Sequence, residues 1–241
     1  MNKVYNTVWN ESTEMWVVTS ELTRKGGRRP RQIRRTALAG LIAGLLLPSA
    51  PALATDYKNQ TLESGGTSSS MSLSAGDTAT NTTINSGGQQ RVSSGGSATG
   101  TTINSGGYQN VSSGGSATST TINSGGMLSV FSGGSAVDIT QNSGGIIFAD
   151  TSATLRGTNI NGSFSIAGGS ASNMLLENGG YLSVLNGHQA TSTTINSGGY
   201  QNVSSGGSAT GTTINSGGYQ NVSSGGSATS TTINRGGYQY V

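Results

Sequence analysis

The stretch SSGGSATGTTINSGGYQNV, at residues 93–111, decides the fold, because near-copies of it recur along the chain. Its SSGG element returns at residues 112–115 and at residues 204–207. The Asn of its TTIN element recurs in steps of 19 residues, apart from one step of 17 and one of 18, at Asn85, Asn104, Asn123, Asn142, Asn161, Asn178, Asn196, Asn215 and Asn234. A fixed period near 20 residues without helix-forming composition is typical of a stacked solenoid. We therefore expect function to lie on a long repetitive surface.

Two Gly-Gly pairs divide each unit, as at Gly95-Gly96 and Gly106-Gly107. Glycine reaches the positive φ angles of a tight corner, and the segments between the pairs carry the Thr, Ile and Val typical of strands. Each unit is thus predicted to hold two or three short strands. Thr101 shares one face of its strand with Ile103.

The strand YQNV places Gln109 and Val111 on one face. Residues equivalent to Gln109 in other units are Leu128, Ile147 and Leu182, so this column is predicted to lie inside.

Stacking is required, because one Ile and one Val per unit cannot form an ordinary globular core. If rungs lie about 4.8 Å apart, each strand pairs with its copy, and Ile84, Ile103 and Ile122 form one buried column. Asn104 and Gln109 are predicted to form amide ladders with their copies. Residues 55–241 then make nine to ten rungs and a rod roughly 45 Å long. Intrinsic disorder is the alternative for a chain this rich in Gly, Ser, Thr and Asn, but disorder does not require Ile and Val in fixed phase.

The less regular residues 143–190 are expected to continue the same coil with better-filled rungs. The predicted fold class is all-β, a parallel β-helix of rungs of about 19 residues.

The basic net charge of +3 belongs to the first residues rather than to the repeats. Residues 1–54 hold eight of the twelve Lys and Arg but three of the nine acidic residues, which leaves the repeats with a net charge of about −2. A nucleic-acid partner is therefore not expected.

Residues 1–54 are predicted to be a cleaved secretory signal peptide. They contain a basic region, the apolar run ALAGLIAGLLL at residues 37–47, and the sequence Ala52-Leu53-Ala54. The eleven apolar residues are too few to span a bilayer, which favours cleavage between Ala54 and Thr55 over a retained anchor helix. The absence of cysteine suits a chain that crosses an oxidising compartment unfolded.

Acidic and basic side chains are too scattered in the repeats to suggest catalysis. Asp138 and Asp150 could approach as a pair of glycosidase carboxylates, but chance placement on the surface is the simpler interpretation. His188 is expected to be an exposed turn residue, and no second His is present for a zinc site. The Gly-Gly corners lack the acidic residue of calcium-binding repeats. No catalytic residue, metal site or cofactor is predicted.

A serine precedes most Gly-Gly pairs, and these serines are the predicted acceptors of a sugar. The main set is Ser94, Ser113, Ser132, Ser205 and Ser224. A second set, in the Asn-Ser-Gly-Gly corners, is Ser86, Ser105, Ser124, Ser143, Ser197 and Ser216. The alternative is that Ser is simply a good corner residue that bonds its own backbone.

Two features resemble a known family. Met1-Asn2-Lys3, Tyr5, Trp9, Val17-Val18, Ser20-Glu21-Leu22 and Arg24 are similar to the extended signal peptide of large Gram-negative autotransporters. The SGGSATSTTINSGG repeats and the segment from Asn161 to Ala190 resemble the passenger domain of AIDA-type self-associating autotransporter adhesins.

The resemblance implies a right-handed β-helix that is exported through the periplasm to the cell surface or secreted. It also implies serines modified with heptose by a cytoplasmic heptosyltransferase. Identical molecules and host-cell surfaces are the implied partners, through self-association, biofilm formation and adhesion.

Members of that family end in an outer-membrane β-barrel, and no strands of that type are recognised after Ala190. The chain is thus expected to be a fragment, a truncated product or a repeat variant. A polysaccharide-degrading β-helix enzyme and a purely structural spacer remain alternatives.

Overall fold

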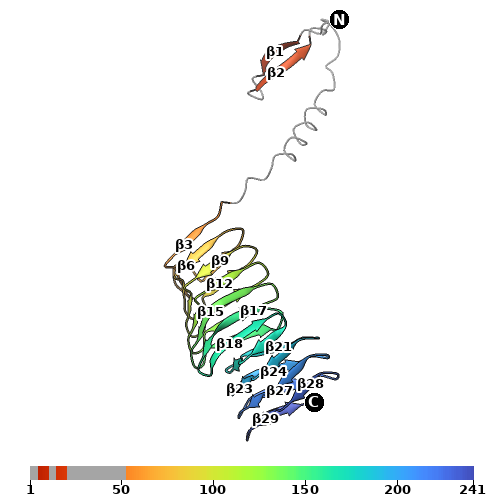
Figure 1. Ribbon diagram of the computed structural model, residues 1–241. Coiled ribbons are helices and arrows are strands. Elements are labelled where there is room, and N and C mark those ends of the chain that lie inside the picture. The colour runs from red at the N-terminus through yellow and green to blue at the C-terminus, as the bar shows by residue number, and fades with distance from the viewer. Residues whose placement is uncertain (1–4, 11–14, 21–52) are drawn as a thin grey trace. The chain divides into compact units, whose positions relative to one another are not determined.

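The computed structural model describes residues 5–10, 15–20 and 53–241, and all of its regular elements there are strands (Figure 1). The chain divides into two units, residues 1–51 and 52–241. In the first unit, β1 (Tyr5–Asn10) pairs with β2 (Met15–Ser20) in antiparallel register, with Trp9 opposite Trp16. The apolar run of the predicted signal peptide lies outside the described residues. Within the described residues, no helix is long and apolar enough to cross a membrane.

The second unit is a coil of parallel strands, and its first face is a nine-stranded sheet. Each regular rung contributes one four-residue strand to this sheet, the YQNV segment or its equivalent. The residues of this segment point alternately outward and inward, as in a strand with one buried face. Its strands are β5 (Ser70–Leu73), β8 (Gln89–Val92), β11 (Tyr108–Val111), β14 (Met127–Val130), β16 (Ile146–Asp150), β21 (Tyr181–Val184), β24 (Tyr200–Val203), β27 (Tyr219–Val222) and β30 (Tyr238–Tyr240).

The second face is formed by the SAT segments and by a local insertion. Its strands are β3 (Asp56–Lys58), β6 (Thr78–Thr80), β9 (Ser97–Thr99), β12 (Ser116–Thr118), β15 (Ser135–Gln141), β17 (Thr154–Asn159), β18 (Gly162–Ala167), β19 (Ser170–Ser172), β22 (Gln189–Thr191), β25 (Ser208–Thr210) and β28 (Ser227–Thr229).

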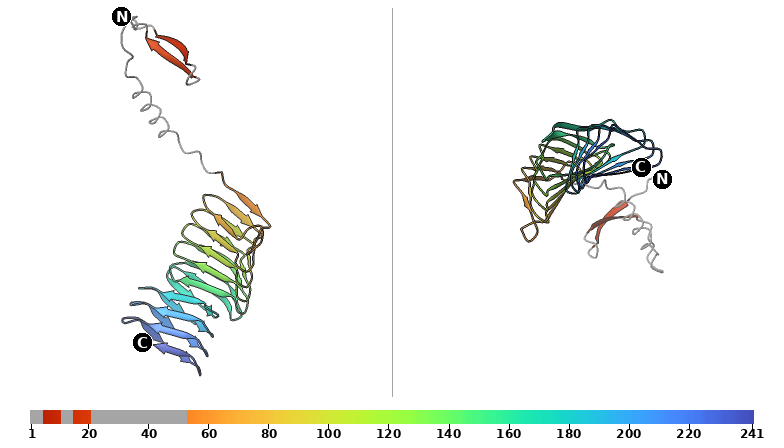
Figure 2. Two further views of the ribbon diagram at one scale, coloured as in Figure 1. Left: turned by 180° about the vertical axis from the view of Figure 1, so that it is seen from behind. Right: turned by 90° about the horizontal axis from the view of Figure 1, so that it is seen from below.

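The third face is formed by the two-residue TI segments. They are β4 (Thr61–Leu62), β7 (Thr83–Ile84), β10 (Thr102–Ile103) and β13 (Thr121–Ile122) before the insertion, and β20 (Leu175–Leu176), β23 (Thr194–Ile195), β26 (Thr213–Ile214) and β29 (Thr232–Ile233) after it. Each regular rung therefore has three strands and three bends, and Figure 2 shows the resulting coil from two sides. This confirms the predicted parallel β-helix and its spacing.

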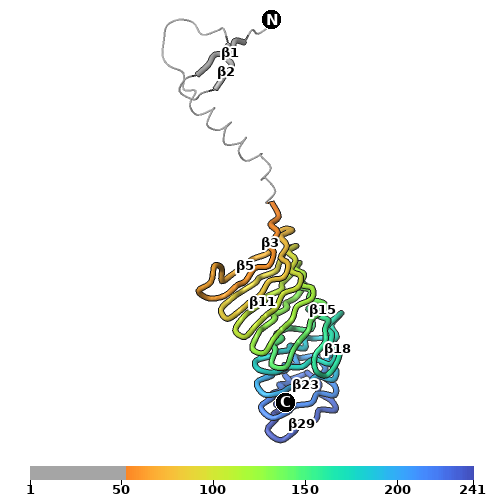
Figure 3. The backbone as a smooth tube through the Cα atoms, turned by 90° about the vertical axis from the view of Figure 1, so that its left-hand side faces the viewer, coloured from red at the N-terminus to blue at the C-terminus, as the bar shows by residue number. Residues whose placement is uncertain are grey.

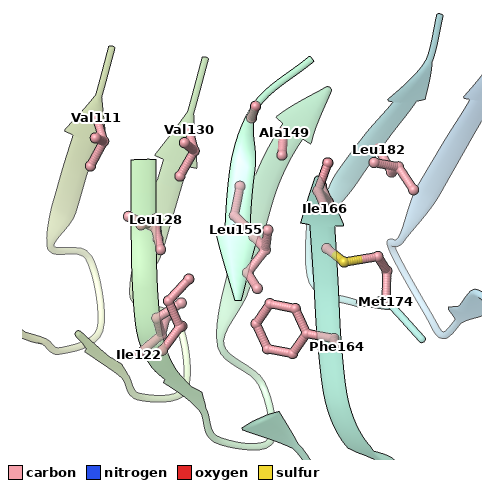
Figure 4. Close-up of a cluster of buried hydrophobic side chains, with 14 of the residues drawn as sticks. Val111, Ile122, Leu128, Val130, Ala149, Leu155, Phe164, Ile166, Met174 and Leu182 are labelled. Carbon is pink, nitrogen blue, oxygen red and sulfur yellow. The ribbon is translucent and has the colours of Figure 1, made fainter. Parts of the chain in front are cut away.

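The core consists of columns of equivalent residues that run along the coil. Ile84, Ile103 and Ile122 pair in register and are fully buried, as predicted. Val111 and Leu128 are buried beside them, and Figure 4 shows how such side chains from successive strands point into the same interior. The small area that each rung buries is thus joined into one continuous apolar core.

The predicted amide ladders are present, and the Gln ladder lies in the interior. The side-chain amide of Gln109 donates to the side-chain oxygen of Gln90 at 2.7 Å, and both residues are fully buried. Thr101 bridges these rungs, because its hydroxyl donates to Gln90 at 3.1 Å and accepts from Gln109 at 3.1 Å. Gln220 repeats the pattern with Gln201 at 2.8 Å. Each buried amide thus finds a partner in the neighbouring rung.

The Asn ladder lies at the corner before the nine-stranded sheet, and a glutamate begins it. Asn104 donates to Asn85 at 2.8 Å, and Asn85 donates to the Glu63 carboxylate at 2.9 Å. After the insertion, Asn196 donates to Glu177 at 3.3 Å, and Asn215 donates to Asn196 at 2.8 Å. A carboxylate suits this first position because it only accepts hydrogen bonds.

The region that was expected to contain ordinary rungs instead carries an antiparallel insertion (Figure 3). β17 pairs with β18 in antiparallel register, and β18 pairs with β19 in the same way, so the second face gains two extra strands. The nine-stranded sheet passes directly from β16 to β21. Gln141 ends the Ile column at this junction, and its side-chain amide donates to the backbone oxygens of Gly145 and Leu175 at 2.9 and 3.1 Å.

Two assignments made from the period are therefore wrong. Asn161 lies in the turn between β17 and β18 rather than in the Asn ladder, and Glu177 takes the ladder position that the period gave to Asn178. The column of Gln109 also shifts, because Leu182 pairs with Ala149 rather than with Ile147. A shift of two residues keeps the same face inward, and Leu182 is accordingly buried.

Candidate modification site

Both sets of predicted acceptor serines lie on the bends that border the nine-stranded sheet. The main set is on the bend that leaves this sheet, and the second set is on the bend that enters it. All eleven serines are exposed. The coil thus carries two rows of hydroxyls, one along each edge of the nine-stranded sheet.

The serine bends are ordered because their backbones are hydrogen-bonded to the next rung. Ser94 N donates to Ser113 O at 2.9 Å, and Gly95 N donates to Gly114 O at 2.8 Å. At the other bend, Gly106 N donates to Gly125 O at 2.9 Å. Since the backbone is already satisfied by its neighbour, the serine hydroxyls are not required to hold the bend.

The first glycine of each pair also leaves room for the serine of the rung before it. A Cβ built on Gly106 would lie 2.8 Å from the Ser86 hydroxyl oxygen, and one on Gly217 would lie 2.9 Å from that of Ser197. Both glycines have positive φ, at 73° and 72°. The Ser-Gly sequence therefore serves both the bend and the contact between rungs.

The third bend was not located from the sequence, and it also carries serines. A single residue with positive φ turns the chain between the second and third faces, as at Ser119 (φ 57°) and Ser192 (φ 53°). Ser230 occupies the same position, and all three are exposed. The sequence signal for this bend is the residue directly before each TTIN element, which is Gly, Ser or Asn, as at Gly100 and Asn81.

The structure does not bring the scattered acidic residues together. Asp138 lies at the third bend with φ 54°, whereas Asp150 ends β16 and accepts a hydrogen bond from Ser152 N at 2.8 Å. Asp138 lines a groove of about 530 Å³ together with Arg156, Thr158 and Phe164, and no second carboxylate lines it. In the described part of the chain, no three potential metal ligands form a cluster.

The two carboxylates with a lowered pKa lie in the first rungs of the coil. The Lys58 ammonium, 2.9 Å away, is the main cause of the lowered pKa of Asp56. The backbone amides of Thr55 and Ser74, at 2.7 and 3.0 Å, lower the pKa of Asp77. These contacts hold the start of the coil and form no catalytic arrangement.

His188 lies at a corner as expected, but it is partly buried. Its Nδ1 is 2.8 Å from the Thr151 hydroxyl, which accepts a hydrogen bond from Leu185 N at 3.1 Å. The Thr151 hydroxyl thus links the His188 ring to the backbone of Leu185, and His188 has a structural partner.

Comparison with known proteins explains the two units. Residues 1–50 match the extended signal peptide of the type V secretion system, and residues 57–107 and 156–218 match the AIDA model, an adhesin of bacterial autotransporter systems and probable stalk. Autotransporter CRAC of Citrobacter rodentium is 82% identical over 205 residues, which cover 77% of this chain and 13% of that protein. The chain belongs to the AIDA-type autotransporter adhesins.

A second member of the AIDA-type adhesins is the autotransporter adhesin/invasin TibA of Escherichia coli O78:H11. It is 79% identical over 92 residues, which cover 38% of this chain and 9% of TibA. The crystal structure of a TibC-catalysed hyper-glycosylated TibA fragment shares 38% identity and covers 77% of this chain and 96% of the fragment, with a TM-score of 0.38. The matched residues thus span about a tenth of the length of CRAC and of TibA.

Family membership confirms two expectations. The extended signal peptide directs this passenger, as in other AIDA-type autotransporters, through the periplasm to the cell surface. The matching family model and TibA are both described as adhesins rather than as enzymes.

Proposed function

We propose that this passenger segment is serine-glycosylated before export and that it mediates self-association, biofilm formation and adhesion to host cells. The two rows of exposed serines carry this proposal, because they repeat one acceptor geometry on an ordered scaffold. TibA, with which the chain shares 79% identity over 92 residues, is the protein whose fragment TibC hyper-glycosylates. A cytoplasmic heptosyltransferase is the proposed partner before export.

Both sets of serines are favoured over the serines of the third bend for a steric reason. Each serine of the two sets is followed by two glycines, so that no side chain follows it on the bend. The serines of the third bend are also exposed, but a Thr follows each of them, and Thr120 after Ser119 and Thr193 after Ser192 are buried. They therefore provide an internal control within the same rungs.

We predict that peptide mapping after co-expression with a heptosyltransferase will find heptose at several of Ser94, Ser113, Ser132, Ser205 and Ser224. Fewer modifications are expected in the Asn-Ser-Gly-Gly set, whose last copy has Arg235 in place of Ser. Ser119, Ser192 and Ser230 should remain unmodified. Heptose found mainly on the third bend, only on threonines, or nowhere would contradict the assignment.

The same chain could serve only as a spacer, since its family model is described as a probable stalk. Cell aggregation separates the two functions, because an adhesin displayed on bacteria should cause settling that a spacer does not. A displayed chain that leaves cells dispersed and does not bind host cells would favour the spacer.

Cleavage between Ala54 and Thr55 is the remaining proposal about processing. Leu53 to Thr55 are exposed, and the first strand of the coil begins at Asp56, so cleavage at this bond leaves every strand of the coil intact. N-terminal sequencing of exported protein should begin at Thr55. Exported material that still carries residues 1–30 would refute the cleavage.

A further inference from the structure

An aromatic column runs along the outer surface of the nine-stranded sheet from β16 to β30. The parallel registers place Phe148 beside Tyr181, Tyr181 beside Tyr200, Tyr200 beside Tyr219, and Tyr219 beside Tyr238. β21, β24 and β27, which carry three of these tyrosines, lie side by side in Figure 1. We call these five residues the aromatic strip. Their strands point alternate residues inward, so that the strip itself faces outward.

The rings of the strip stack in two groups along the coil. The ring centroids of Phe148 and Tyr181 are 4.7 Å apart with an interplanar angle of 21°, and those of Tyr181 and Tyr200 are 5.7 Å apart at 5°. Tyr219 and Tyr238 stack at 5.2 Å and 11°. Within each group, neighbouring rings cover each other's faces, so that ring edges and hydroxyls are turned outward there.

The strip is uncharged and partly exposed, since Phe148, Tyr181 and Tyr200 are half-buried. Tyr219 and Tyr238 expose 37% and 48% of their surface. A tyrosine hydroxyl, with an ordinary pKa of about 10, is protonated at neutral pH, and burial raises the pKa of Tyr200 further. From β21 to β30, no strand residue of the nine-stranded sheet is charged.

A second outward column lies beside the strip, in the order Asp150, Ser183, Asn202, Asn221 and Tyr240, and it is uncharged after Asp150. Asn202 and Asn221 are half-buried, and the amide nitrogen of Asn221 donates to the Asn202 oxygen at 2.9 Å. Phenol hydroxyls and carboxamides both donate and accept hydrogen bonds. A surface made of such groups at a constant spacing is complementary to a second copy of itself.

We infer that the aromatic strip is the surface through which one copy of this chain binds another. This inference deepens the self-association proposed above by naming its face. An isologous contact requires a patch that can meet itself, and an uncharged patch of hydroxyls and amides meets this condition without repulsion. If one molecule slid past the other by one rung, the contacts would be preserved, because the YQNV strand is repeated. This property suits association between long repetitive molecules.

The test compares one introduced charge on two faces of the same rungs. Tyr219→Asp places a carboxylate in the strip, whereas Thr210→Asp places it on the exposed second face, where Thr210 makes a hydroxyl contact of 3.1 Å with Thr229. Sedimentation velocity of the exported chain over a concentration series gives the association constant of each variant. Tyr219→Asp should weaken association by at least about tenfold, since a contact face would bury two like charges, and Thr210→Asp should leave it unchanged.

Tyr219→Ser provides a variant without a charge, and it should also weaken association while the circular dichroism spectrum stays that of the parent. If the parent associates but the Tyr219 and Thr210 variants behave alike, the strip is the wrong face and the proposed self-association stands. If the parent remains monomeric throughout the series, both the strip and the proposed self-association are refuted.

Discussion

Replacing Ile103 by Asp should unfold several rungs of the coil. Ile103 is fully buried between Ile84 and Ile122 in one column, and the described contacts offer no cationic partner there. An unpaired carboxylate in such a site costs several kcal/mol, which is a large part of the stability of a small domain. Because each rung contacts only its neighbours, the damage should spread to the rungs above and below.

Limited proteolysis and circular dichroism measure this effect, and Tyr108→Asp is the matched control. Tyr108 lies on the next strand of the same rung, but its side chain is outward and only half-buried. The control should therefore keep most of its β-structure and its resistance to protease. Equal loss in both variants, or no loss in either, would show that the inside and outside of the rung are wrongly assigned.

The regular part of the fold could be predicted because each rung repeats the same local solution. A strand that alternates Gln109 and Val111 with outward residues has one possible inner face, and a 19-residue period fixes which copy lies next to it. The Ile column and the Gln and Asn ladders follow from these two conditions. Where the period is unbroken, only one order of strands in each sheet is therefore possible.

The insertion could not be predicted from the same signals. Its strands also alternate apolar and polar residues, as Phe164 and Ile166 do, but pairing direction depends on contacts that the alternation does not specify. The Asn161-Gly162 dipeptide is a sequence signal typical of a β-hairpin, and the chain turns at Ile160 and Asn161, whereas counting the period placed Asn161 in a ladder. A turn signal was thus interpreted as a repeat signal.

The exposure of the two serine rows could be predicted from their positions at Gly-Gly corners. The position of the third bend could not be predicted. Its turn residue changes between Asn81, Gly100 and Ser119, which share positive φ rather than residue type. A repeated conformation without a repeated residue leaves little trace in a sequence.

Substituting Gly126 by Ala should destabilise the coil although the change adds only one methyl group. Gly126 is the second glycine of its corner, and its φ lies outside the positive range, so that alanine meets no backbone strain there. The added Cβ would instead lie 2.5 Å from the carbonyl oxygen of Ile103 in the preceding rung. That oxygen accepts a hydrogen bond from Asn123 N at 2.9 Å, so it cannot move away without breaking the ladder. Overpacking of this kind costs about 1–3 kcal/mol.

Gly66→Ala is the control, because Gly66 occupies the same corner position in the first rung of the coil. The nearest atoms to its added Cβ all belong to the Glu63 side chain rather than to the backbone, and the closest is Cγ at 2.7 Å, so that this side chain has to shift together with its hydrogen bond from Asn85. The other corner of the coil supports this difference. Asp77 occupies the equivalent position in the first rung, whereas Gly96 occupies it in the second rung, where an added Cβ would meet the backbone oxygen of Leu73. Thermal unfolding should therefore show a clear fall in midpoint for Gly126→Ala and a smaller fall for Gly66→Ala. An equal fall in both would mean that the glycine is required by the bend itself rather than by the rung beneath it.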